Sequence, residues 1–280
     1  MINLFKPKYR KKEIFRHISE CIDLGWTGQG YKTNQFENEF RFYTKFKNAH
    51  FVSSATIGLD LAVKVLKKRN NWNDEDEIIT TPITFVSTNH SIVYNNLTPV
   101  FADVDEQLCL DLCSIKKNIT KKTKAVIFVG MGGNVGQYFD ILKFCKENNI
   151  ILILDAAHMM GTQSKGYQVG DESDACVFSF HSVKNLPTAD SGMVCFKDDE
   201  NDDFCRKMSW MGIDKNTFNR LNGKTYNWKY DVVDFGIKGH SNSIMASFGL
   251  VGLKYLEQDN VKRRILTELY EQKLNKISIK

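Results

Sequence analysis

The chain has 280 residues, of which 42% are hydrophobic and 25% are charged, and its formal net charge is +5 at pH 7. This length suits one large core, or a large domain with part of a second. The composition is that of a soluble globular protein, and the basic residues are too dispersed along the chain for a nucleic-acid-binding face. The sequence contains no apolar run of membrane-spanning or signal-peptide length, so we expect a cytoplasmic protein with no membrane partner.

Helix-like and strand-like segments alternate along the chain. We predict helices, in chain order, at Glu39–Phe46, Ile57–Lys68, Val86–Tyr94, Asp140–Glu147 and Ile244–Leu256. Between them we predict strands at Glu77–Thr80, Thr98–Val104, Ala125–Val129, Ile150–Leu154, Ala175–Phe178 and Met193–Phe196. Continuous apolar strands separated by helices indicate an α/β fold, with a parallel or mixed sheet covered on both faces. From about Asn201 the pattern changes to polar, aromatic-rich loops, and the last helix opens a second domain.

The cysteines indicate a reducing environment. None of the seven forms a CxxC pair, and their odd number argues against a disulfide framework. We therefore expect reduced, buried thiols at Cys21, Cys109, Cys113, Cys145, Cys176, Cys195 and Cys205.

Asp155 directly follows the aliphatic run Ile150–Leu154. Ligands of open α/β sheets collect at the carboxyl ends of the strands, so this acid is expected at the edge of the sheet and half desolvated. The alternative is an ordinary helix cap, since aspartate also suits that position.

Lys184 follows the strand Ala175–Phe178, within the segment Ser179-Phe180-His181-Ser182-Val183-Lys184-Asn185. A single lysine is more often a surface residue. An aspartate and a lysine at neighbouring strand ends, however, match the needs of pyridoxal 5'-phosphate (PLP). The lysine forms the Schiff base once its pKa is lowered by its surroundings, and the aspartate pairs with the pyridine nitrogen. We therefore predict PLP as the cofactor, Lys184 and Asp155 as the catalytic pair, and no metal.

The phosphate of PLP needs backbone N–H donors at the start of a helix. Ser54, Ala55 and Thr56 open the helix Ile57–Lys68, although an ordinary Ser/Thr cap is nearly as good an interpretation. The lysine loop adds a hydroxyl and an N–H from Ser179 and His181. Phe85 is the candidate to stack on the cofactor ring. The alternative is that Phe85, like most phenylalanines, belongs to the hydrophobic core.

These residues resemble the DegT/DnrJ/EryC1/StrS sugar aminotransferases, which are fold-type I PLP enzymes. The resemblance runs from about Leu24 to Leu256. It is carried, in order, by Gly25–Gly30, Phe36–Phe40, Ser54–Thr56, Asp74–Ile79, Pro82–Thr88, Pro99–Asp105, Asp155–His158 and Ser179–Asn185.

The resemblance implies a three-layer PLP-transferase large domain of the aspartate aminotransferase type over residues 1–240. Residues 241–280 would begin a small C-terminal domain that is incomplete. By the resemblance, Ala55, Thr56 and Ser179 hold the phosphate, and Phe85 stacks on the ring. Asp155 meets the ring nitrogen, His158 lies near the ring hydroxyl, and Lys184 is the Schiff-base lysine.

The resemblance also implies a homodimer whose active sites share residues. The segment Gly236–Asn242 matches the one that reaches the partner's phosphate, and His240 stands where family members usually carry Asn or Arg. A histidine at this position is a weaker and pH-dependent anchor. The family's Gly-Glu-Gly-Gly turn after the lysine is replaced here by Ala189–Gly192, and Ala55 replaces the glycine of Ser-Gly-Thr.

The residues and the resemblance together predict a PLP-dependent aminotransferase. The resemblance implies that it moves an amino group from an amino acid, glutamate, to a nucleotide-linked keto-deoxy sugar for polysaccharide biosynthesis. A PLP-dependent sugar dehydratase is one alternative. Dehydratases that resemble this family, however, carry His at the position of Lys184. A truncated, catalytically weak homologue that binds PLP or dimerises is another. Val183 before the lysine weighs against a desulfurase, and a nicotinamide enzyme lacks its GxGxxG after the first strand.

Overall fold

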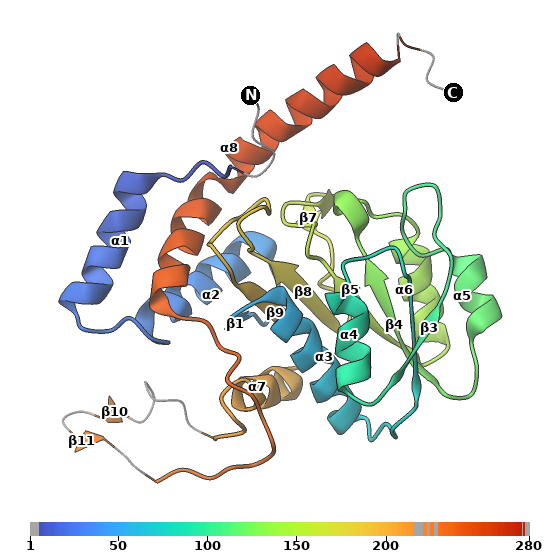
Figure 1. Ribbon diagram of the computed structural model, residues 1–280, viewed down its shortest axis with the longest axis horizontal. Coiled ribbons are helices and arrows are strands. Elements are labelled where there is room, and N and C mark those ends of the chain that lie inside the picture. The colour runs from blue at the N-terminus through green and yellow to red at the C-terminus, as the bar shows by residue number, and fades with distance from the viewer. Residues whose placement is uncertain (1–5, 215–220, 223–224, 227–228, 276, 278–280) are drawn as a thin grey trace.

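The computed structural model describes residues 6–214, 221–222, 225–226, 229–275 and 277. Its centre is a seven-stranded sheet (Figure 1) in the order β1-β9-β8-β5-β4-β2-β3. The strands are β1 His50–Val52, β2 Glu77–Thr80, β3 Thr98–Phe101, β4 Thr123–Val129, β5 Ile151–Asp155, β8 Ala175–Ser179 and β9 Gly192–Phe196. β9 is antiparallel to both of its neighbours, and the other neighbouring strands pair in parallel. Two small hairpins pair β6 Gln163–Ser164 with β7 Tyr167–Gln168, and β10 Leu221–Asn222 with β11 Thr225–Tyr226.

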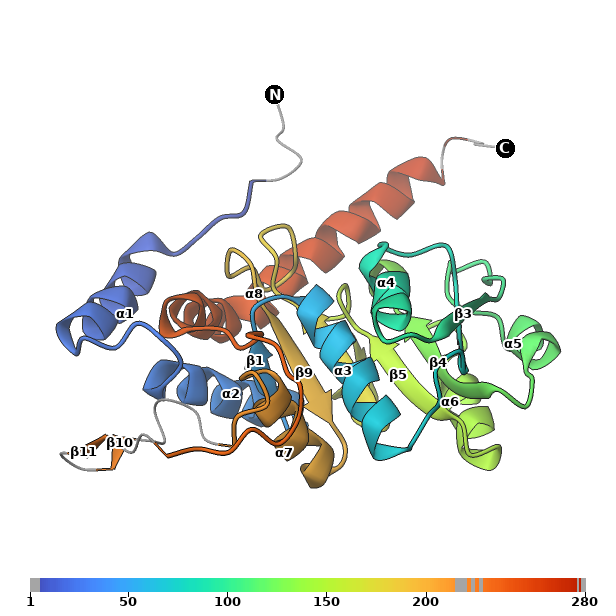
Figure 2. The ribbon, with the colours of Figure 1, turned by 60° about the horizontal axis from the view of Figure 1, so that its bottom comes forward.

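Helices cover both faces of the sheet and form a three-layer structure (Figure 2). They are α1 Lys11–Asp23, α2 Tyr31–Thr44, α3 Ala55–Arg69, α4 Ser87–Tyr94, α5 Leu112–Asn118, α6 Tyr138–Glu147, α7 Asp199–Met208 and α8 Ser243–Leu274, with one short 3-10 turn, Met131–Gly133. One core lies between the sheet and helices α2, α6 and the first half of α8. The second core lies on the other face, beneath α3, α4 and α7.

The alternation of side chains along each strand explains the two cores. In β4, Val126 and Phe128 belong to the first core, whereas Ala125 and Ile127 belong to the second. Successive residues of a strand point to opposite faces, and a parallel sheet covered on both faces therefore needs apolar residues at every position. The predicted α/β fold and its mostly parallel sheet are confirmed.

Several local predictions were wrong. α2 begins at Tyr31 rather than at Glu39. At this earlier start, the Thr33 side chain accepts a hydrogen bond from the Gly30 N–H at 3.0 Å. The expected loops from Asn201 are instead helix α7 as far as Met208. Asp198 caps this helix by accepting from the Asn201 N–H at 3.0 Å. Both helices carry many polar residues, so their few buried positions do not form a recognisable apolar pattern in the sequence.

Helix α8 is one continuous helix of 32 residues that begins at Ser243, just after the expected domain boundary at residue 240. Its first half packs on α1 and α2 and buries Ala246, Leu250 and Leu256. Its second half projects away from the body of the molecule (Figure 1). The division into a large domain and a small domain at residue 240 stays a prediction.

The cysteines of the described residues are free. Six are buried as expected, whereas Cys113 is exposed on α5. Among the described residues, no helix combines the length and apolar character needed to cross a membrane.

A buried ionic network joins α2, β1 and α7. The Glu37 carboxylate accepts hydrogen bonds from the Phe51 N–H at 2.7 Å and from the Arg206 guanidinium at 3.0 Å. His50 lies 3.3 Å from Glu37, and its other ring nitrogen lies 2.7 Å from the Ser209 hydroxyl. Burial alone would raise the pKa of Glu37, but the charge of Arg206 and the contact with His50 bring it down to about 2.

Replacing Glu37 with glutamine (Glu37→Gln) is expected to lower the free energy of unfolding by about 3 kcal/mol near neutral pH, because the buried carboxylate is lost and the half-buried Arg206 keeps only Asp202, at 2.7 Å, as a counter-charge. The pKa of Glu37 is about 2 in the fold, below its ordinary value of 4.5. Its stabilising contribution is therefore present above pH 4.5 and is lost as the pH falls toward 2.

Urea unfolding of both proteins, near neutral pH and at about pH 3, measures this contribution; the gap between them should narrow at the lower pH. Glu39→Gln, an exposed site on the same helix, is the matched control and should unfold like the wild type. Equal stability of the two variants near neutral pH would contradict the assignment.

Candidate active site

A cavity of about 440 Å³ lies at the carboxyl ends of β4, β5 and β8, beside the first turn of α3. Nine of the ten residues predicted for the cofactor site line it, namely Ser54, Ala55, Thr56, Phe85, Asp155, His158, Ser179, His181 and Lys184. His240 is outside it. The structure therefore brings these nine residues together, while the role of each one stays a prediction.

Asp155 forms a buried wall of the cavity at the end of β5. Its carboxylate accepts hydrogen bonds from the Thr88 hydroxyl at 2.7 Å and from the Ala157 N–H at 3.1 Å. Turns, and no helix, occupy residues 156–162, so Asp155 is not a helix cap. Burial raises the pKa of Asp155, while the two hydrogen bonds and the charges of His158 and Lys184 act in the opposite direction.

Lys184 lies on the loop that follows β8. Its backbone N–H donates to the His181 carbonyl at 2.9 Å, and the Ser182 N–H donates to the Ala189 carbonyl at 3.0 Å, which closes the loop on itself. The side chain is half-buried. Burial lowers the pKa of Lys184, with a smaller opposing effect from Asp155. The amine is thus more easily neutral than that of an exposed lysine, as a nucleophile requires.

His158 is held by the short glycine-containing turn Met131–Gly133. The Gly132 N–H donates to Nδ1 of His158 at 3.2 Å, which places the proton of the neutral ring on Nε2. Gly132 has a φ of 63°, a left-handed conformation that glycine favours. Burial and then the charge of Lys184 lower the pKa of His158, which favours the neutral ring.

The first turn of α3 supplies the N–H donors at one end of the cavity. Ser54 is the N-cap, and its hydroxyl accepts from the Ile57 N–H at 3.1 Å. The amides of Ala55 and Thr56 occupy the first two helical positions, where no carbonyl of the helix can reach them. Ser179 is buried at the end of β8, and its hydroxyl accepts from the His181 N–H at 3.3 Å.

Gly192 permits this close approach of α3 to the sheet. It pairs with Ser179 across β8 and β9. A Cβ atom added to Gly192 would lie 2.7 Å from the backbone nitrogen of Ala55 and 2.9 Å from the carbonyl oxygen of Phe178. Such distances exclude any side chain. Thr88, Gly132 and Gly192 were all missing from the predicted site, because their contacts join segments far apart in the sequence.

Two residues that depart from the family pattern, Ala189 and His240, lie outside the contacts described so far. Ala189 has a φ of 151°, a conformation that favours glycine, at a position where the family turn carries glycine. His240 pairs with Val52 of β1, and its ring centroid lies 4.6 Å from that of Trp210. Its Nδ1 lies 2.8 Å from the Ser241 carbonyl, and its buried Nε2 has no hydrogen-bond partner among the described residues.

The residues of the cavity fit PLP. Asp155 is the most direct evidence, because a buried carboxylate with a raised pKa is stabilised by a cationic partner such as a protonated ring nitrogen. The amides of Ala55 and Thr56 point to an anion at the helix start. PLP-dependent transferases use a lysine and an aspartate in these two tasks, so the fold and the cavity point to that class.

Comparison with known proteins agrees with this class. Residues 8–280 match the model of the DegT/DnrJ/EryC1/StrS aminotransferase family. The spore coat polysaccharide biosynthesis protein SpsC of Bacillus subtilis is 34% identical over 95% of this chain and 67% of its own length. The GDP-perosamine synthase of Vibrio cholerae is 30% identical over 98% of this chain and 71% of its own length.

Solved structures give the same result. The aminotransferase TlmJ from Streptoalloteichus hindustanus has a TM-score of 0.89 and 30% identity, over 99% of this chain and 72% of that one. The putative sugar aminotransferase Spr1654 from Streptococcus pneumoniae, in its PLP form, has a TM-score of 0.84 and 27% identity, over 96% of this chain and 70% of that one. The chain belongs to the DegT/DnrJ/EryC1/StrS aminotransferase family. The predicted family, three-layer fold and PLP-dependent class of enzyme are confirmed.

Replacing Gly192 with alanine (Gly192→Ala) is expected to lower the free energy of unfolding by about 1–3 kcal/mol, since the new methyl group must push the start of α3 off the sheet. Urea unfolding measures the change. Gly28→Ala is the matched control, because a Cβ there meets no atom within 4 Å. If both variants unfold alike, Gly192 does not hold α3 against β8.

Proposed function

We propose that this protein transfers an amino group from glutamate to the keto carbon of a nucleotide-linked deoxy sugar. The observation that carries the proposal is the single cavity lined by Lys184, Asp155 and the first turn of α3. The sugar part is supported by relatives whose names refer to such chemistry, among them the GDP-perosamine synthase. PseC of Helicobacter pylori, an aminotransferase involved in pseudoaminic acid biosynthesis, is 27% identical.

Asp155 and Lys184 have complementary tasks. Bound PLP supplies an electron-accepting ring for reaction at the carbon that carries the amino group. Asp155 would pair with the ring nitrogen and keep it protonated. Lys184 would hold the cofactor through Nζ, and once displaced by the amino donor it would carry a proton on the same atom. The lowered pKa of Lys184 suits both tasks, because each one needs the neutral amine.

The remaining residues would position the cofactor. The amides of Ala55 and Thr56, with Ser54, Ser179 and His181 beside them, would hold the phosphate. Phe85 is 71% exposed at the cavity, so a face of its ring is accessible for stacking. His158 would face the ring hydroxyl.

A homodimer would complete the site. Ile83, Phe85 and Val86 leave a large apolar area exposed beside the cavity, a surface that a second copy would cover. The segment Gly236–Asn242 would bring His240 to the partner's phosphate once the ring turns out from its place beside Trp210, where Nε2 is buried. Nδ1 of His240 donates its proton to the Ser241 carbonyl, so Nε2 of the neutral ring carries no proton. Nε2 would therefore donate to phosphate only when the ring is protonated.

The absorbance spectrum of the protein incubated with PLP tests the proposal. We expect a visible, near-violet band that glutamate removes as the amino group passes to the cofactor. Lys184→Ala should give no such band, whereas Lys121→Ala, an exposed site in a turn, should behave like the wild type. A band that no amino acid changes would contradict transamination and support a protein that only binds the cofactor.

A further inference from the structure

Thr88 joins two residues of the candidate site, although it does not line the cavity itself. It lies in the first turn of α4 and is fully buried. Its hydroxyl donates to the Asp155 carboxylate at 2.7 Å, and its backbone N–H donates to the Phe85 carbonyl at 3.1 Å. Thr88 therefore connects the buried acid at the end of β5 with the aromatic residue proposed to stack on the cofactor ring.

The Thr88 hydroxyl is the middle member of a short chain of hydrogen bonds. The Thr84 hydroxyl, which lines the cavity, lies 2.8 Å from it. A hydroxyl carries a single proton, and Thr88 uses its proton on Asp155, so Thr84 must donate to Thr88. Each bond in such a chain polarises the next. Because hydrogen bonds to a carboxylate are stronger than those to a neutral acid, the chain favours the charged form of Asp155.

The carboxylate of Asp155 is held through both of its oxygens. Oδ2 accepts from Thr88, and Oδ1 accepts from the Ala157 N–H at 3.1 Å. Each oxygen of a carboxylate can accept two hydrogen bonds, so lone pairs remain for a further donor. A cofactor with a protonated ring nitrogen would be such a donor.

The start of α4 is itself anchored to the sheet. Thr80, the last residue of β2, donates through its hydroxyl to the Asn89 side chain of α4 at 3.1 Å. Thr88 is thus placed by β2, whereas Asp155 is placed by β5. The hydrogen bond between Thr88 and Asp155 therefore joins two separately fixed elements and sets the direction of the carboxylate.

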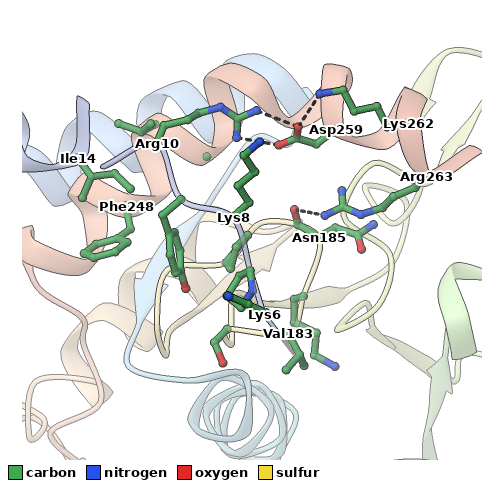
Figure 3. Close-up of a pocket in the computed structure, with 17 residues that line it drawn as sticks. Lys6, Lys8, Arg10, Ile14, Val183, Asn185, Phe248, Asp259, Lys262 and Arg263 are labelled. Carbon is green, nitrogen blue, oxygen red and sulfur yellow. Dashed lines mark hydrogen bonds and ion pairs between the residues drawn. The ribbon is translucent and has the colours of Figure 1, made fainter. Parts of the chain in front are cut away.

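The loop that carries Lys184 is anchored at a different place. Figure 3 shows Arg263 on α8, whose guanidinium donates to the Asn185 carbonyl at 3.4 Å. Within the part of the chain that the structure describes, no hydrogen bond joins Thr88 to this loop. A substitution at Thr88 is thus expected to act on Asp155 and to leave the lysine loop in place.

We propose that Thr88 is a positioning residue that keeps the Asp155 carboxylate charged and oriented toward the ring nitrogen of PLP. The inference rests on the role that the proposed function gives to Asp155. Thr88 acts through the carboxylate and does not touch the cavity. Its hydroxyl should therefore matter for a ligand whose ring contains the nitrogen, and should not matter for a ligand of the same shape without it.

Calorimetric titration with two ligands tests the inference. The first is pyridoxamine 5'-phosphate, which has the ring nitrogen but no carbonyl group to react with a lysine. The second is its deaza analogue, in which carbon replaces the ring nitrogen. The wild type should prefer the first ligand. Thr88→Val should reduce this preference about tenfold, because a charge-assisted hydrogen bond to Asp155 is lost, and should bind the deaza analogue like the wild type.

Three further variants serve as controls. Thr80→Val removes another buried threonine hydroxyl that contacts α4 without reaching Asp155, and should keep the preference of the wild type. Thr88→Ser retains the hydroxyl and should also keep it. Thr88→Ala lacks the hydroxyl and should lose the preference as Thr88→Val does, so the test does not depend on a single variant.

Equal weakening of both ligands by Thr88→Val would reveal a structural role alone and overturn the inference, as would an unchanged preference. A wild type that binds both ligands equally would overturn it too, because Asp155 would then not pair with the ring nitrogen. The band of the PLP-loaded wild type is recorded separately with glutamate. If glutamate leaves that band unchanged while the preferences follow the prediction, the proposed transamination is wrong and the role of Thr88 stands.

Discussion

The pairing of β5 with β8 is the constraint on which the candidate site depends. Asp155 lies opposite Val177 in this parallel pair. The ladder continues past the strand end, since the Gly130 N–H donates to the Asp155 carbonyl at 3.1 Å and the Ala156 N–H donates to the Val177 carbonyl at 2.9 Å. The backbone of Asp155 is therefore fixed from both sides. Two residues beyond Val177, β8 ends at Ser179, and the loop that follows carries Lys184.

Electrostatics links this geometry to the chemistry. Burial raises the pKa of Asp155 and lowers the pKa of Lys184, so in each case it disfavours the charged form. A cofactor with a basic ring nitrogen and a carbonyl group would suit both residues. The ring nitrogen would pair with Asp155, and the carbonyl group would react with the neutral amine of Lys184. The helix start at Ala55 would provide the complementary site for its phosphate.

The sequence predicted what depends on strand ends and missed what depends on contacts between distant segments. Asp155 and Lys184 follow apolar strands, and that position alone brought them together. Thr88 and Gly192 gave no local signal, because the first matters through a hydrogen bond to Asp155 and the second through the space beside Ala55. Helix α7 was missed because its first turn, with Asp199, Glu200 and Asp202, reads as a polar loop. These acids favour a helix start, which the Asp198 cap completes.

The central claim is that Lys184 is the residue to which PLP attaches. Borohydride reduction of the PLP-loaded protein, followed by peptide mass mapping, tests it most directly, because reduction makes the attachment permanent at whichever lysine carries the cofactor. We expect the label on the peptide containing Lys184 and no label on that peptide in the Lys184→Ala variant. Labelling of another lysine at equal yield in both proteins would contradict it.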